Sequence, residues 1–160
     1  MPGKGFSLIE LMVVILLIGI VTAIGLPRFL RSPVSVSQDF IFRLNSLTAE
    51  AVEQAQKEGA PRRIFFNLPA SLVEIQSAQG KRVGGTLTIP PTISLRDIAI
   101  NGVSQFHQGS GEKRTCYFLI NAEGLGQEVL LILDEQTSSG ATKQYDFYLN
   151  PFTSLFRVVQ

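Results

Sequence analysis

An uncharged stretch near the amino terminus constrains this chain more than any other feature. The run of 17 residues from Leu11 to Pro27 has no charged side chain, and the apolar character extends back to Phe6. A helix rises about 1.5 Å per residue, so a helix from near Phe6 to near Leu26 would cross a bilayer core of about 30 Å. The sequence therefore predicts one membrane-spanning helix over residues 6–30.

The rest of the chain has the composition of one small soluble domain. The whole chain has 160 residues, of which 45% are hydrophobic and 17% are charged. Its net charge of +1 argues against a polyanion as the main partner. The single cysteine, Cys116, excludes an intramolecular disulfide, and together with the single histidine, His107, it cannot form a conventional zinc site.

A cleaved secretory signal peptide is the first alternative for the apolar segment. Lys4 would supply the positive region that precedes the hydrophobic stretch of such a signal. The stretch is longer than usual, however, and it ends in Gly25-Leu26-Pro27 rather than in an A-x-A-like cleavage site. These features favour a retained helix.

Glu10 is the unexpected residue of the apolar segment. Placing a carboxylate at bilayer depth costs roughly 2.5–3.5 kcal/mol on insertion scales, so the group needs a compensating partner. A side chain near the helix end that reaches the lipid headgroups is one explanation for Glu10. Pairing with a positive group of another subunit is the other.

The residues around Glu10 form a longer pattern, Lys4-Gly5-Phe6-Ser7-Leu8-Ile9-Glu10. A short basic leader ends in glycine, an apolar residue follows, and glutamate is the fifth residue after that glycine. This pattern resembles the prepilin peptidase recognition site of the type IV pilin and type II secretion pseudopilin superfamily. Pro27 also falls where that superfamily places a helix-loosening proline.

The resemblance implies a processing and assembly chemistry. Prepilin peptidase would cleave between Gly5 and Phe6 and methylate the new amine of Phe6, which keeps its positive charge. In a filament, that amine of one subunit would meet the Glu10 carboxylate of a neighbour, so Glu10 is the expected assembly residue. Gly25 and Pro27 would loosen the helix, although they are also compatible with a simple helix end followed by a linker.

The resemblance also implies an orientation and a location. Lys4 and the chain amine precede the segment, and Arg28 and Arg31 follow it, so the positive-inside rule does not distinguish the two orientations. The superfamily places the amino terminus in the cytoplasm, a single span in the bacterial inner membrane, and the carboxy-terminal domain in the periplasm. After assembly the chain would be part of a pseudopilus.

The remaining sequence predicts a helix followed by strands. Between Val34 and Gly59, apolar residues recur on one helical face. They are Phe40, Leu44, Leu47, Ala51 and Ala55. The helix should stop at Gly59-Ala60-Pro61. Short apolar or alternating runs then predict nine strands: Arg63–Leu68, Leu72–Gln76, Thr86–Ile89, Arg96–Ile100, Val103–Phe106, Thr115–Ile120, Glu128–Leu133, Gln144–Leu149 and Leu155–Val159. Gly84-Gly85 is predicted as a turn and Asn101-Gly102 as a tight hairpin.

The predicted fold class is α+β and pilin-like. A long transmembrane helix continues into an amphipathic helix that packs on an antiparallel β-sheet domain. The domain organisation follows: a cleaved prepilin leader over 1–5, a transmembrane and assembly helix over 6–30, a linker and amphipathic helix over 31–61, and a periplasmic β-rich domain over 62–160.

Within the superfamily, the chain most resembles the minor pseudopilins of the H type. Its strand and acidic-glycine turn at 117–124, followed by closing strands at 129–133 and 155–159, are similar to that group. A major pilin would commonly have a disulfide, and the acidic residues Asp134, Glu135 and Asp146 are too scattered for the calcium site of the major pseudopilin. The I and J types remain open, whereas the K type commonly lacks the acid present here as Glu10.

No catalytic, cofactor or metal motif is present in the sequence. There is no glycine-rich phosphate loop, HExxH, GxSxG or C-x-x-C pattern. Cys116 is expected to be a small core residue and His107 a loop or strand-end residue. We therefore expect no enzyme activity, no cofactor and no metal.

The expected function is that of a minor pseudopilin that helps to initiate a type II secretion pseudopilus or to assemble its tip for export of folded exoproteins. Its partners would be the major and minor pseudopilins, prepilin peptidase, the inner-membrane secretion platform and secreted cargo. Two alternatives stay open: a structural pilus subunit, and a minor pilin that binds DNA in a competence pilus. Three basic pairs could serve DNA binding, namely Arg62-Arg63, Lys81-Arg82 and Lys113-Arg114.

Overall fold

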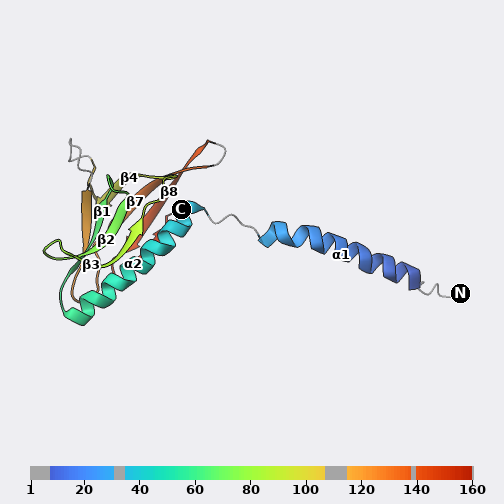
Figure 1. Cartoon of the computed structure of the whole chain (residues 1–160), viewed down its shortest axis with the longest axis horizontal. Helices are drawn as coiled ribbons and strands as arrows, with labels where there is room; N and C mark the ends of the chain where they lie inside the picture. Colours follow the sequence, from blue (N-terminus) through green and yellow to red (C-terminus); the bar gives the residue numbers. More distant parts are fainter. Residues whose placement is uncertain (1–7, 31–34, 107–114, 138–139, 160) are drawn as a thin grey trace. The chain divides into compact units, whose positions relative to one another are not determined.

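The computed structural model describes residues 8–30, 35–106, 115–137 and 140–159, with only the backbone described for 22–30. The chain divides into two compact units, Met1–Val34 and Ser35–Gln160, which are described separately below. The fold class is α+β, as the sequence predicts (Figure 1).

The first unit contains one helix, α1 (Leu8–Leu30). The helix passes through Gly25 and Pro27 without a break, so neither residue ends it. Within the described ranges, no helix meets the length and apolarity required of a membrane span, and the transmembrane prediction for residues 6–30 is not confirmed. Gly5 and Phe6 lie outside the described residues.

The second unit begins with the amphipathic helix α2 (Val36–Glu58). The Ser35 side chain accepts a hydrogen bond from the Gln38 N–H at the start of the helix, and Gly59 at φ 61° ends it in the left-handed conformation. The five apolar residues predicted to form one face are all buried. The helix prediction and its stop signal are therefore confirmed.

The strands form two antiparallel sheets in the spatial orders β3-β2-β1-β6 and β5-β4-β7-β8-β9. Their bounds are β1 (Arg62–Asn67), β2 (Leu72–Ser77), β3 (Arg82–Thr88), β4 (Ile93–Ile100), β5 (Val103–Ser104), β6 (Thr115–Ile120), β7 (Val129–Gln136), β8 (Thr142–Asn150) and β9 (Leu155–Val158). Each of the nine predicted strands is present, with ends that differ by a few residues. Although β6 follows β5 in the chain, β6 pairs with β1 in the first sheet and β5 pairs with β4 in the second.

One hydrophobic core joins α2 to both sheets. The helix lies along the strands (Figure 1) and contacts β1, β2, β3 and β6 of the first sheet and β7 and β9 of the second. Phe118 of β6 is fully buried and contacts Phe66 of β1, with ring centroids 6.3 Å apart, and Phe156 of β9, with centroids 6.1 Å apart. Phe118 thus connects the two sheets through aromatic contacts.

The prediction of a turn at Gly84-Gly85 is wrong, because both glycines lie inside β3. A Cβ atom on Gly85 would lie 2.7 Å from a Glu50 carboxylate oxygen of α2. The Gly85 N–H also donates to Glu50 Oε1 at 3.0 Å. The glycines therefore permit close approach of helix and strand rather than a change of chain direction.

The hairpin prediction at Asn101-Gly102 is confirmed. The two residues have φ values of 51° and 78°, as a two-residue turn with both central residues at positive φ requires. They connect β4 to β5, which pair in an antiparallel manner.

Glu135 of β7 binds the start of α2 from a distant part of the sequence. Its carboxylate accepts hydrogen bonds from the Val36 N–H at 3.0 Å and the Ser37 N–H at 3.1 Å. Burial acts to raise the pKa of Glu135, whereas the Ser37 hydroxyl, these two N–H groups and the Lys143 ammonium act to lower it. The net pKa lies below the ordinary glutamate value, so the folded state favours the ionised carboxylate.

The hydrogen bonds from Val36 and Ser37 to the Glu135 carboxylate should make a pH-dependent contribution to stability. Because the folded-state pKa of Glu135 is lowered, its contribution is present above the unfolded-state pKa of about 4.3 and is lost as pH falls through the folded-state pKa. At neutral pH we expect Glu135→Gln to lower the free energy of unfolding by about 1–3 kcal/mol. The difference in the free energy of unfolding between Glu135→Gln and the unmodified chain should become smaller as the pH is lowered, and urea unfolding at several pH values measures it. Asp134→Asn on the opposite face of β7 is the control, and an equal, pH-independent loss in both variants would contradict the assignment.

Asn45 of α2 binds the outer edge of β9. Its side-chain amide donates to the Phe156 carbonyl oxygen at 3.1 Å, and its oxygen accepts from the Phe156 N–H at 2.7 Å. The Asn45 amide therefore makes the two backbone hydrogen bonds to Phe156 that a neighbouring strand would otherwise make. This protects the edge of the second sheet from pairing with another strand.

Candidate functional site

Glu10 lies in the first turn of α1, at the start of a helix with an apolar surface. A carboxylate in this position interacts favourably with the helix dipole. Large apolar side chains along the helix are between 44% and 77% exposed; they are Leu8, Ile9, Leu11, Met12, Val13, Val14, Ile15, Leu16, Leu17, Ile18, Ile20 and Val21. Exposed apolar surface of this extent is typical of a segment that is covered by lipid or by another protein.

Cys116 of β6 does not have the environment of a nucleophile. The residue is 7% exposed, and burial, with a further contribution from the charge of Asp97, raises the pKa of its thiol to about 12. The thiol therefore stays protonated at neutral pH. His107 lies outside the described residues.

The structure brings one residue from each of two basic pairs into a row and buries a third basic residue. Arg62 is only 3% exposed and pairs with the Glu58 carboxylate, so it is not available to a phosphate. Arg63 and Arg82 lie in one row across the first sheet, each opposite Gln76 of β2. The Lys113-Arg114 pair lies outside the part of the chain that the structure describes.

The acidic residues near the carboxy terminus do not converge either. Glu135 is occupied by the start of α2, and Asp134 pairs in register with Gln144 on the other face of β7. Over the described ranges, no group of three metal-ligating side chains comes together.

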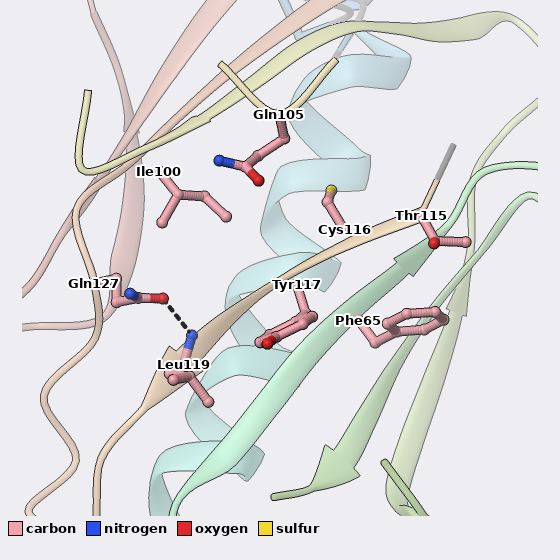
Figure 2. A pocket seen from close by; sticks show the side chains of 8 residues that line it. All are labelled: Phe65, Ile100, Gln105, Thr115, Cys116, Tyr117, Leu119 and Gln127. Atoms are coloured by element: carbon pink, nitrogen blue, oxygen red, sulfur yellow. Dashed lines mark hydrogen bonds between the residues drawn. The ribbon is translucent and has the colours of Figure 1, made fainter. Parts of the chain in front are cut away.

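A groove beside β6 was not predicted from the sequence. It has a volume of about 430 Å³ and is shown in Figure 2. It is lined by Phe65, Ile100, Gln105, Thr115, Cys116, Tyr117, Leu119 and Gln127. The sequence alternation of Thr115, Tyr117 and Leu119 predicts that these side chains share one face of a strand. It does not predict which edge of that strand lacks a neighbouring strand, because that depends on the order of the strands in the sheet.

The amino-terminal segment matches a known family model. Residues 3–26 match the model described as the prokaryotic N-terminal methylation motif. The match includes Gly5, Phe6, Glu10 and Gly25, and it indicates a type IV pilin-like amino terminus of the kind that prepilin peptidase processes. No curated protein and no solved structure matches the chain.

Proposed function

We propose that this chain is a minor pseudopilin of a type II secretion system, similar to the H type. Prepilin peptidase cleaves it between Gly5 and Phe6 and methylates the Phe6 amine. The match of residues 3–26 to the methylation motif is the observation that carries this proposal. The match covers the proposed cleavage position, the methylated residue and Glu10.

The proposed location is the inner membrane before assembly and the periplasmic pseudopilus after it. The uncharged run from Leu11 to Pro27 and the exposed apolar side chains of α1 support a membrane anchor. The amino terminus would be cytoplasmic, and the Ser35–Gln160 unit would be periplasmic. Partners in this state are other pseudopilins, the inner-membrane secretion platform and folded cargo.

The folded unit supports the assignment to a minor, H-type subunit. Two antiparallel sheets on one helix agree with the many strands that the resemblance to this group implies. Gly124 at φ 85° lies in the expected acidic-glycine turn between β6 and β7. The single cysteine gives no disulfide of the kind common in major pilins.

A clean deletion of the gene in its host tests the function. We expect loss of exoproteins from the culture supernatant with cargo build-up in the periplasm, and restoration by the intact gene. Uptake of labelled DNA is measured in parallel. Intact secretion with lost DNA uptake would contradict the secretion role and favour a competence pilus, while loss of neither would favour a structural pilus subunit.

A further inference from the structure

The backbone of β6 is open along part of one edge. Leu119 shows the direction, because its N–H donates to Gln127 Oε1 at 2.8 Å and its carbonyl oxygen accepts from the Gln127 N–H at 3.1 Å. Gln127 lies on the opposite side of β6 from β1, so both backbone groups of Leu119 point away from β1 (Figure 2).

Tyr117 and Thr115 must point the same way. The register between β6 and β1 is unbroken from Arg62↔Ile120 to Asn67↔Thr115. In an antiparallel pair, alternate residues bond to the partner strand and the residues between them point away from it. The N–H and C=O groups of Thr115 and Tyr117 therefore face the groove, and among the described residues they have no hydrogen-bond partner.

The groove has the dimensions and chemistry to accept another strand. Its volume of about 430 Å³ falls within the roughly 300–1,000 Å³ range of ligand sites. The side-chain amides of Gln105 and Gln127 are on its wall, opposite Tyr117 (Figure 2). Gln127 already binds Leu119 as a neighbouring strand would, so an added strand would continue that pairing along β6.

Arg63 of β1 contributes a positive charge on the face of the first sheet that the Tyr117 side chain also occupies. Its guanidinium lies 4.5 Å from the centre of the Tyr117 ring, and no carboxylate within the described ranges forms an ion pair with it. Residues that are directly opposite in a sheet share a face, and Arg63 is opposite Leu119. An acidic side chain on the added strand would complement this charge.

We propose that the β6 edge at Thr115 and Tyr117 binds an extended peptide segment of a partner protein, which adds as a strand and places an acidic side chain near Arg63. The unpaired backbone groups supply the affinity, and the groove and Arg63 supply the selectivity. This site is independent of the assembly role of α1, so either proposal can fail without the other.

The test uses the full-length chain in detergent micelles and a fluorescent, blocked peptide of alternating valine and threonine with one central aspartate. Its analogue with every backbone amide N-methylated keeps the side chains and lacks the donors. We expect the first peptide to bind at millimolar concentration or below and the second not to bind. Absence of binding by the first peptide, or equal binding by both, would overturn the proposal.

Matched variants locate the site. Thr115→Pro removes an N–H that is not used in pairing with β1, and proline is tolerated at the first residue of an edge strand. We expect binding about threefold to tenfold weaker in Thr115→Pro, and unchanged binding in Thr115→Ala, which keeps the N–H. Arg63→Gln should weaken binding of the aspartate peptide but not of its asparagine counterpart. Equal affinity in Thr115→Pro and Thr115→Ala would overturn the site.

Amide hydrogen exchange on the unmodified chain gives a readout that does not depend on a variant folding. The Thr115 and Tyr117 amides should exchange faster than those of Cys116 and Phe118, and they should become protected when the peptide binds. Protection of other amides, without protection of the Thr115 and Tyr117 amides, would contradict the proposal.

Sedimentation of the chain without peptide tests whether a second copy of this chain occupies the β6 edge. A dimer that Thr115→Pro abolishes would overturn the assignment to a partner protein.

Discussion

Glu10→Ala should leave the chain inserted and cleaved but should make it assemble poorly into the proposed pseudopilus. The physical reason is that a methylated Phe6 amine would lose its buried counter-ion in the neighbouring subunit. Breaking a buried ion pair costs about 3–5 kcal/mol, which corresponds to more than about 100-fold in subunit affinity. The measurement is the fraction of processed chain that co-sediments with sheared pseudopili.

Two further variants separate charge from packing at this position. Glu10→Gln keeps the size of the side chain and removes its charge, so it should assemble as poorly as Glu10→Ala. Met12→Leu, two residues along α1, is a nearly volume-conserving apolar change and should assemble normally. Normal assembly of Glu10→Gln would show that the carboxylate charge has no role in subunit contact.

Phe118→Ala should cause a large loss of stability in the Ser35–Gln160 unit. The side chain is fully buried and contacts aromatic rings of both sheets. Removing a buried phenyl ring and leaving a cavity costs about 3–5 kcal/mol. Urea unfolding followed by far-ultraviolet circular dichroism measures this loss as a shift of the transition midpoint.

Tyr117→Ala is the matched control for this prediction. Tyr117 is adjacent in β6 but lies on the opposite face and is 42% exposed. Its loss removes the contact with the Arg63 guanidinium, which contributes about 0.5–1 kcal/mol. If Tyr117→Ala destabilised the unit as much as Phe118→Ala does, the assignment of Phe118 to the shared core would be wrong.

The local elements of the fold could be predicted because their signals are local in sequence. The spacing of Phe40, Leu44 and Leu47 gave the buried face of α2, and alternation gave the strands. The turn at Asn101-Gly102 followed from the need for two positive φ values. Gly84-Gly85 gave a false turn signal because glycine also permits close approach of a helix to a strand.

The features that could not be predicted depend on residues far apart in sequence. Glu135 belongs to a set of acidic residues too scattered in sequence for a calcium loop, and nothing in that pattern predicts that it binds the start of α2, almost 100 residues earlier in the chain. Asn45 binds the edge of β9 across a similar separation. Neither contact has a local pattern, since both arise only after the two sheets and the helix have packed together.

The functional features likewise include one that is local in sequence and one that depends on distant residues. The processing motif is continuous in sequence, and residues 3–26 alone are sufficient to match its family model. The open edge of β6 exists because β6 pairs with β1 on one side and has Gln127 beside it on the other. This strand order could not be inferred from the alternation of residues 115–120.

The mass of the amino-terminal peptide of the native chain tests the central claim most directly. We expect a chain that begins at Phe6 and has one methyl group on its amine, as the methylation motif over residues 3–26 predicts. A chain that still begins with Met1, or one that has been cut after the apolar segment near Gly25, would contradict processing by prepilin peptidase and the pilin-like account that depends on it.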